Sequence, residues 1–529
     1  MVRTGFAAAL CAFVLAFGSV PAAIAADNLA GPPVVTIEQG EIRGKMDSGA
    51  AAYLGIPFAA PPVGKLRWQP SQPARPWSGV RDGTQFGPSC PQPAGLGQRD
   101  VGKQDEDCLY LNVWTAARAG EKKPVMVWIH GGGCTTGSGS LAYYNGAALA
   151  RSGVVVVTIN YRLNIFGYFA HPALSKESPN NASGNYGTLD QIAALRWVKK
   201  NIAAFGGNPD CVTVFGESAG SLSICRLLVS PLAKGLFHRA ICQSGGAHGR
   251  NRHLRTAVGR LESMEDVGTG LAARLGCDKA DDVLAALRAK TPAELLRAAN
   301  PAQGLFGKGV KFGPIVDGWA IPDDPGKLFD QGKFHHVPTM IGANADDGSM
   351  FVQQLPIKHP AGYRLTVQML FSDQAETLLR LFPAATDEDV PKVLNKLVTV
   401  AAFAWPAKRI AASMATHEGA AYLYQFSRVP PIARARTLGA FHGLEIAYVF
   451  GNLRDGSGFD QTDQALSRTM MACWTSFAAT GRPTAPGVEA WPAYDPAADK
   501  HMDFGDTCGV KGGMFKEACE ALSKQARQR

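Results

Sequence analysis

Short apolar runs alternate with longer amphipathic stretches along the chain. The apolar runs are hydrophobic on both faces, as in parallel strands that helices cover on both sides. They predict strands at 124–129, 154–159, 212–215, 240–243, 337–342 and 421–426. Residues 189–203 carry apolar side chains at spacings of three and four, which predicts a helix between two of these strands. Strands separated by helices indicate an α/β fold with a large, mostly parallel central sheet.

Two further stretches, 250–330 and 350–415, have a mostly helical pattern. We expect them to form helical insertions over one edge of the sheet. The chain has no internal repeat and no linker long enough to mark a second domain. Residues 27–529 are therefore expected to form a single domain.

The first 26 residues have the pattern of a secretory signal peptide. Arg3 supplies a short basic region, residues 6–17 form an apolar run, and residues 23–25 offer small side chains for cleavage. The alternative, a membrane anchor, normally needs roughly 20 apolar residues. We expect export with cleavage, and hence a secreted or periplasmic protein. No later segment has the length and apolarity to cross a bilayer, so we expect no membrane span.

Composition narrows the class of protein. Of the 529 residues, 46% are hydrophobic and 18% are charged, whereas disorder requires low hydrophobicity with high charge. The formal charge of 53 − 44 = +9 is mild for this length, and the basic residues are scattered. No RNA-binding signature or Arg-rich tract is present, so we expect no nucleic-acid partner. A basic mouth that attracts anionic substrates is compatible with this charge, but the scattered basic residues favour a solvated basic surface.

Gly216-Glu217-Ser218-Ala219-Gly220 is the only G-x-S-x-G sequence in the chain. It follows a predicted strand and precedes the helical run 222–228. This strand–turn–helix context is typical of a nucleophile elbow, in which glycines allow a strained turn that exposes the serine. The alternative is a serine in an ordinary tight turn.

His130-Gly131-Gly132-Gly133 follows the predicted strand 124–129. Consecutive glycines let the backbone approach a ligand closely and turn its amides toward it. A phosphate-binding loop would require a following Lys-Ser/Thr, which is absent. The pattern before a G-x-S-x-G elbow instead indicates an oxyanion hole.

A serine hydrolase of this kind needs an acid and a histidine, in the chain order Ser, Asp or Glu, His. His442 follows the predicted strand 421–426, whereas His335 and His336 precede a strand and so lie at the wrong edge of the sheet. The acid is expected after the strand 337–342, where spacing alone leaves Asp346 and Asp347 as equal candidates.

The sequence gives no support for a metal or an organic cofactor. It contains no His-Glu-x-x-His and no Cys-x-x-Cys, the patterns typical of zinc sites. Cys90 and Cys108 bracket a Pro/Gly-rich loop in a chain expected to reach an oxidising compartment. Spacing alone does not fix which cysteines pair.

Together these motifs resemble the type-B carboxylesterases, the cholinesterase-like branch of the α/β-hydrolases. The resemblance covers nearly the whole chain after residue 26, and it implies the α/β-hydrolase fold and hydrolysis of carboxylic esters. The segments that carry it, besides the elbow, are 53–59 (YLGIPFA), 61–64 (PPVG), 106–113 (EDCLYLNV), 185–187 (NYG), 189–191 (LDQ), 205–209 (FGGNP) and 441–446 (FHGLEI).

The resemblance assigns roles to residues at the matching positions. It implies that Ser218 is the nucleophile and that His442 is the base. It also implies that the backbone amides of Gly132, Gly133 and Ala219 are the oxyanion donors.

The acid is a departure from the family. The family position is usually Glu in an Asp-Glu-Gly triplet, and Asp347 stands there, one methylene shorter. The resemblance also implies two buried ion pairs with a structural role, Arg67 with Glu106 and Arg162 with Asp190.

Other features concern the disulfide and the substrate. The resemblance implies a Cys90–Cys108 disulfide. The loop between them lacks the tryptophan with which choline esterases hold a quaternary ammonium, which argues against a choline ester. Cys134 replaces an aromatic residue that the family often has after the oxyanion glycines, which widens the expected pocket.

Two functions from different classes are compatible with this fold. The first is a serine carboxylesterase that hydrolyses a small-molecule ester through an acyl-enzyme, with Ser218, His442 and Asp347 as its triad. The second is a non-catalytic binding protein on the same fold. Since binding relatives have typically lost triad members, the sequence favours the esterase. The mild positive charge predicts that anionic or polycarboxylate esters are accepted better than cationic ones.

Overall fold

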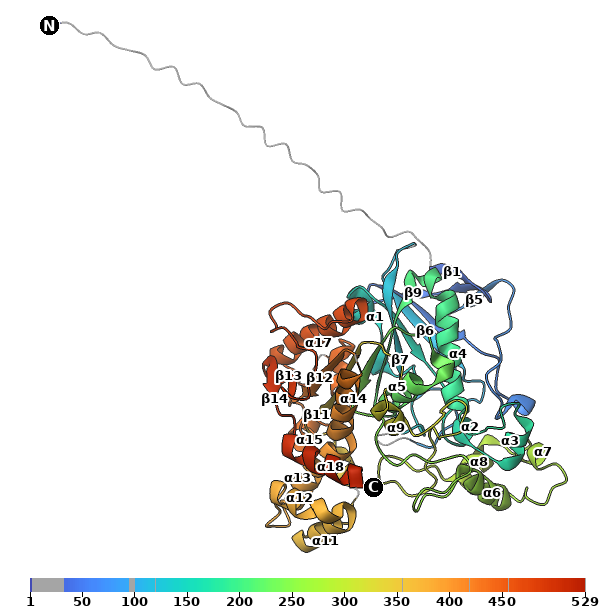
Figure 1. Cartoon of the computed structure of the whole chain (residues 1–529). Helices are drawn as coiled ribbons and strands as arrows, with labels where there is room; N and C mark the ends of the chain where they lie inside the picture. The colour runs from blue at the N-terminus through green and yellow to red at the C-terminus, as the bar shows by residue number, and fades with distance from the viewer. Residues whose placement is uncertain are drawn as a thin grey trace.

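The computed structural model of this chain describes Met1 and residues 33–94, 100–118, 120–353, 355–417, 419–454 and 456–528. The expected signal peptide therefore lies outside the described residues, Met1 apart. Within these ranges, eleven strands form the central sheet (Figure 1). From one edge to the other they are β14 (Cys508–Gly512), β13 (Lys500–Phe504), β12 (Ala421–Phe426), β11 (Thr339–Asn344), β10 (Arg239–Gln243), β9 (Gly207–Glu217), β7 (Lys123–Ile129), β8 (Val155–Ile159), β6 (Tyr110–Thr115), β4 (Ala50–Pro57) and β3 (Lys45–Asp47).

The middle of the sheet, from β8 to β13, is parallel, and the strands at both edges are antiparallel. A small second sheet consists of β1 (Val34–Ile37), β2 (Gly40–Arg43) and β5 (Val80–Asp82). Because parallel strands end at the same edge, the loops after β7, β9, β11 and β12 converge there, which is where α/β folds place their sites.

Helices cover both faces of the sheet. They are α1 (Ala147–Arg151), α2 (Asn164–Tyr168), α3 (Pro172–Glu177), α4 (Tyr186–Asn201), α5 (Ala219–Val229), α6 (Met264–Arg274), α7 (Val283–Arg288), α8 (Pro292–Ala299), α9 (Pro325–Asp330), α10 (Ser349–Val352), α11 (Pro360–Phe371), α12 (Ala375–Leu381), α13 (Val390–Thr399), α14 (Trp405–Thr416), α15 (Ala433–Leu438), α16 (Glu445–Val449), α17 (Gln461–Thr480) and α18 (Lys516–Gln528). Figure 1 shows two helical groups beyond the sheet, α3 with α6 to α8 and α11 to α13 with α18.

The alternation of side chains along β7 explains the layers. Val127 packs in the apolar cluster that contains α4, α5 and α14, whereas Trp128 packs in the cluster with α1, α16 and α17. Successive side chains of a strand point to opposite faces, so a strand covered on both sides is apolar throughout.

The predicted fold class is confirmed, because all six predicted strands and the helix within 189–203 are present. Their ends differ: β9 runs over Gly207–Glu217, and α4 begins at Tyr186 and gives way at Ile202 to a 3₁₀ turn. The helical prediction for 350–415 holds.

The prediction that 250–330 is mostly helical is wrong. Only α6 to α9 are helical there, and residues 300–324 are irregular, with isolated bridges from Pro301 to Val310 and from His253 to Val316. This part is rich in glycine and proline, which interrupt helices.

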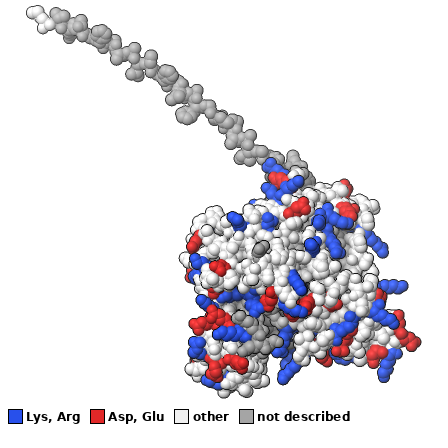
Figure 2. All heavy atoms as spheres, viewed as in Figure 1, with Lys and Arg blue, Asp and Glu red and all other residues white. Residues whose placement is uncertain are grey.

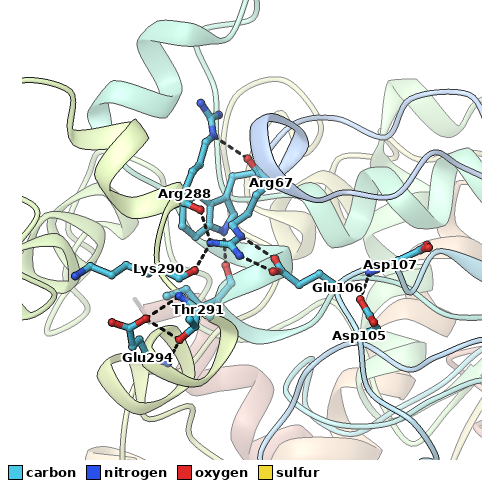
Figure 3. A network of polar contacts seen from close by, with 10 residues as sticks. Arg67, Asp105, Glu106, Asp107, Arg288, Lys290, Thr291 and Glu294 are labelled. Carbon is cyan, nitrogen blue, oxygen red and sulfur yellow. Dashed lines mark hydrogen bonds and ion pairs between the residues drawn. The ribbon is translucent and has the colours of Figure 1, made fainter.

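Both ion pairs implied by the resemblance are present. Arg67 forms a two-pronged pair with Glu106, and its Nη1 donates to the carbonyl oxygens of Arg288 (3.0 Å) and Lys290 (2.7 Å) (Figure 3). The pair thus joins the N-terminal segment to the end of α7.

Arg162 and Asp190 form the more deeply buried pair. Nε and Nη2 of Arg162 each donate to Asp190 over 2.8 Å, and the Arg162 amide donates to the same carboxylate over 3.0 Å. The exposed fractions of the two side chains are 3% and 0%. The pair connects α4 to the loop after β8.

We predict that Asp190→Asn lowers the free energy of unfolding by about 3–5 kcal/mol, because it leaves a buried guanidinium without its counter-charge. Urea unfolding of the purified protein measures this. Asp210→Asn, at an exposed position, is the control and changes the value by less than about 0.5 kcal/mol. Equal stability of the two variants contradicts the prediction.

Candidate active site

Ser218 lies at the turn between β9 and α5, with φ 56° and ψ −119°. A non-glycine residue pays about 1–3 kcal/mol for such a conformation, which persists only where the surroundings impose it. The Ser218 amide donates to the carbonyl of Gln243 over 2.8 Å, which ties the turn to the end of β10. The elbow therefore has the strained geometry expected from its sequence.

Two glycines of the motif allow the turn to pack against the end of β7. A Cβ atom at Gly220 would lie 1.9 Å from the carbonyl oxygen of Ile129, and one at Gly216 would lie 2.5 Å from it. Any side chain at either position would push the helix and the strand apart. This contact brings the glycine loop after Ile129 next to Ser218.

The amides expected to form the oxyanion hole are available for a ligand. Gly132 (φ 101°) and Gly133 (φ 65°) have left-handed backbone conformations, and Ala219 is the first residue of α5. Among the described residues, no hydrogen bond uses the amide of any of the three as donor. Amides of a first helical turn have no partner within the helix and carry the positive end of its dipole.

His442 contacts Asp347 and not Asp346. Its Nδ1 lies 2.7 Å from Asp347 Oδ1, and Asp347 Oδ2 accepts a hydrogen bond from the Asn344 amide over 2.8 Å. Burial raises the pKa of the Asp347 carboxyl, and the contact with His442 opposes that rise. The shorter Asp at the family's Glu position thus reaches the imidazole.

Asp346 instead connects the two loops that carry Asp347 and His442. Its carboxylate accepts hydrogen bonds from the Ala440 amide over 3.1 Å and from Lys396 over 2.7 Å. Asn395 adds a third at 2.8 Å. The Asp346 side chain therefore binds two donors on α13 and the backbone amide two residues before His442.

Glu217 is a site residue that sequence reasoning missed. Its Oε1 lies 3.0 Å from His442 Nε2, and no hydrogen bond between Ser218 Oγ and His442 is present among the described residues. Catalytic hydrogen bonds are often loose in unliganded enzymes and tighten with substrate. The sequence feature that could have identified Glu217 is its position inside the G-x-S-x-G motif, directly before the serine.

The charge of Glu217 governs the protonation of the imidazole. Burial by itself lowers the pKa of His442, but the charges of Glu217 and Asp347 and their contacts with the ring hold it well above its ordinary value. The resting imidazole is therefore biased toward its charged form.

A third carboxyl, Glu445, lies behind the site and was also missed, although it belongs to the segment that carries the resemblance. It accepts hydrogen bonds from Asn344 (2.6 Å) and Gln243 (3.1 Å). Burial and the charges of Glu217 and Asp347 raise the pKa of Glu445 to about 8. At neutral pH this carboxyl is mostly protonated, which limits the negative charge around His442.

Apolar rings shield the imidazole. The rings of Phe351 and Phe403 lie 5.0 and 4.8 Å from that of His442. Cys134, after the oxyanion glycines, is buried, and burial raises the pKa of its thiol to about 11. The position that the family often fills with an aromatic ring therefore holds a small, neutral thiol.

The remaining predicted residues lie elsewhere. His335 and His336 precede β11, and the ring Nε2 atoms donate to the carbonyl oxygens of Ser230 and Gly332. Cys90 and Cys108 are buried free thiols, and a side-chain hydrogen bond between them, together with burial, raises the pKa of Cys108. Over the described residues, no cluster of three or more His, Cys, Asp or Glu has the arrangement of a metal site, and no helix is long and apolar enough to span a bilayer.

An elbow serine at the carboxyl edge of a mostly parallel sheet, facing a glycine loop and a His–Asp pair, defines a hydrolase of the α/β class. Known proteins agree. The model of the carboxylesterase family matches residues 31–522. Fumonisin B1 esterase of Sphingopyxis macrogoltabida is 40% identical, over 97% of this chain and 93% of the relative. Para-nitrobenzyl esterase of Bacillus subtilis is 37% identical, over 87% and 92%.

A solved structure of PNB esterase superposes with a TM-score of 0.79 and 33% identity, over 93% of this chain and all of that one. The chain therefore belongs to the carboxylesterase family, and it is a carboxylic ester hydrolase.

We predict that Asp347→Asn lowers kcat by about 10⁴, the scale of a serine-protease triad Asp, because the imidazole loses its orienting anion. Asp346→Asn costs far less, since its contacts are with Ala440 and Lys396. Asp347→Glu is also impaired, because a Cβ at Gly348 would lie 2.3 Å from Asn395 O, so the loop has no room to retreat. Steady-state hydrolysis of a simple ester measures all three; a crippling Asp346→Asn with a mild Asp347→Asn contradicts the assignment.

Glu217→Gln tests the electrostatics of the imidazole. Removing one of the two anions that raise the pKa of His442 lowers that pKa, so neutral imidazole persists to lower pH. We predict that the acidic limb of the kcat/KM profile shifts to lower pH. Glu388→Gln, at an exposed position, is the control and leaves the limb in place. A limb that stays, or moves to higher pH, contradicts this account.

Proposed function

We propose that this carboxylesterase acts through a triad of Ser218, His442 and Asp347. The observation that carries the proposal is the 2.7 Å contact between His442 and Asp347 beside the strained Ser218 elbow. His442 takes the proton of Ser218 as its Oγ attacks the ester carbonyl, and Asp347 stabilises the imidazolium that forms.

The oxyanion of the tetrahedral intermediate is accepted by the amides of Gly132, Gly133 and Ala219. Their free N–H groups support this role, since donors aimed at developing charge contribute most to acyl transfer. His442 then protonates the departing alcohol, and water releases the acyl group from Ser218 by the reverse sequence. No cofactor takes part.

The preferred substrates are small-molecule esters with an anionic or polycarboxylate portion. The net charge of +9 supports this preference, and one relative carries the name of a mycotoxin esterase, Fumonisin B1 esterase. On the face shown in Figure 2, however, basic and acidic side chains are interspersed, so a general surface field is a weak source of selectivity.

The protein acts outside the cytoplasm, as a secreted or periplasmic enzyme whose residues 27–529 form one catalytic domain. The pattern of the first 26 residues supports export, and the adjacent thiols of Cys90 and Cys108 support a disulfide in an oxidising compartment. N-terminal sequencing and non-reducing mass mapping of exported protein test both. An uncleaved N-terminus, or two free thiols in that material, contradicts them.

We predict that Ser218→Ala lowers kcat on the order of 10⁶-fold, the scale of serine knockouts in subtilisin. A fluorophosphonate labels wild-type protein at Ser218 and leaves the variant unlabelled. Ser221→Ala, one turn further along α5, is the control and keeps the label. A Ser218→Ala protein with a tenth of the wild-type activity rules out this nucleophile, and folded wild-type protein that is neither labelled nor active favours a binding role.

A further inference from the structure

Arg226, two turns along α5 from Ser218, is a buried cation without a counter-ion. Four arginines are buried among the described residues, and three of them are paired with carboxylates: Arg67, Arg162 and Arg428. Arg226 is equally buried, with 8% of its surface exposed, and no carboxylate lies within ion-pair distance of it among the described residues. A buried charge without compensation is costly, so it calls for an explanation.

The contacts of Arg226 leave part of its guanidinium free. Nη1 donates to the carbonyl oxygens of Leu222 (3.1 Å) and Gly246 (3.0 Å), and Nη2 donates to Asn251 Oδ1 over 2.7 Å. A guanidinium has five N–H donors, so two remain without an acceptor among the described residues. Arg226 is connected to the carboxylate of Asp324 only through Asn251, whose Nδ2 donates to Asp324 over 2.7 Å. Asp324 also caps the N-terminus of α9.

The position of the guanidinium links it to the nucleophile. Helical side chains point toward the helix N-terminus, and the bond to Leu222 O shows that Arg226 does so. Its head thus lies about 5–11 Å from Ser218 along the helix axis. Gly246, whose carbonyl it holds, follows Gly245, where a Cβ would lie 2.8 Å from Ser218 O.

The surroundings of Cys134, beside the oxyanion glycines, are electropositive as well. The positive charge of Arg226 acts on the thiol of Cys134, next to the oxyanion glycines. A Cβ at Gly313 would lie 3.9 Å from that sulfur, and the segment leading to Gly313 carries two exposed cations, Lys308 and Lys311. Neither lysine has an ion pair among the described residues.

We propose that Arg226 binds a free carboxylate on the acyl portion of the substrate, so that the enzyme prefers monoesters of short dicarboxylic or polycarboxylic acids such as succinyl esters. This inference deepens the proposed function and rests on Ser218 as the nucleophile. The substrate carboxylate supplies the missing counter-charge and accepts the two free N–H groups. Two such bonds fix the acyl chain with its ester carbonyl over Ser218.

Three substrates separate this subsite from a general field. Monoethyl succinate carries the carboxylate on the acyl side, ethyl 4-methylpentanoate is its neutral isostere, and the butanoate ester of glycolate carries the carboxylate on the alcohol side. Proton release in a pH-stat gives kcat/KM for each. Wild-type protein is expected to prefer monoethyl succinate over both.

Arg226→Gln is expected to lower the ratio of kcat/KM for monoethyl succinate to that for its neutral isostere by about 10- to 100-fold, the scale of hydrogen bonds to a charged group. Arg226→Lys restores part of the ratio, since it keeps the charge without the two-pronged geometry. The control, Lys327→Gln on nearby α9, removes an exposed cation paired with Asp323 and leaves the ratio within about twofold.

Several outcomes overturn the proposal. If Arg226→Gln lowers both values in parallel, Arg226 is structural. If Arg226→Gln lowers the ratio of kcat/KM for the glycolate ester to that for the neutral isostere by the same factor, Arg226 acts through a general electrostatic field. Should the variants not fold, wild-type protein decides: a preference for the neutral ester, or equal inhibition of neutral-ester hydrolysis by succinate and by succinamide, refutes the subsite. In each case fluorophosphonate labelling of Ser218 shows whether the esterase mechanism itself still stands.

Discussion

The site depends on one close contact, between the elbow and the end of β7. The carbonyl oxygen of Ile129 occupies the space where side chains at Gly216 and Gly220 would lie. This approach holds Ser218 in its strained conformation, and it brings the loop that starts at His130 to the first turn of α5. The nucleophile and the amides opposite it are thus positioned by a single packing constraint, which explains why the motif needs glycine at both ends.

A second constraint is the balance of charge around one imidazole. Three carboxyls, Glu217, Asp347 and Glu445, surround or back His442, more than one positive charge can neutralise. The protein limits the imbalance by burying Glu445 among amide donors, where it stays mostly protonated near neutral pH. Asp347 orients the ring, and Glu217 biases it toward its charged form. The anions that stabilise the resting imidazolium therefore also reduce the fraction of His442 that is neutral and able to act as a base.

The fold and the main site residues were accessible from sequence because their causes are local. A run that is apolar on both faces marks a covered strand, and the elbow announces itself by a short motif after such a strand. The choice between Asp346 and Asp347 needed either the resemblance or the structure, since both follow β11. Contacts such as that of Glu217 with His442 could not be predicted from the sequence, because they join segments that are far apart in the chain. β13 was missed because His501 and Asp503 are polar although they are buried, so the run is not apolar on both faces; pairing with β12 places it in the sheet.

The buried arginines show how one residue type serves two purposes. Arg67 and Arg162 each hold a carboxylate in a fixed two-pronged geometry, so their charges are cancelled within the fold and they join segments far apart in sequence. Arg226 has a comparable degree of burial, but its nearest carboxylate lies beyond Asn251. Its desolvation is therefore only partly offset by the folded chain, and a neutral side chain would cost less. A cation at position 226 favours the binding of an anionic ligand. The ion pair between Arg226 and that ligand forms on binding and not on folding, so its free energy contributes to affinity.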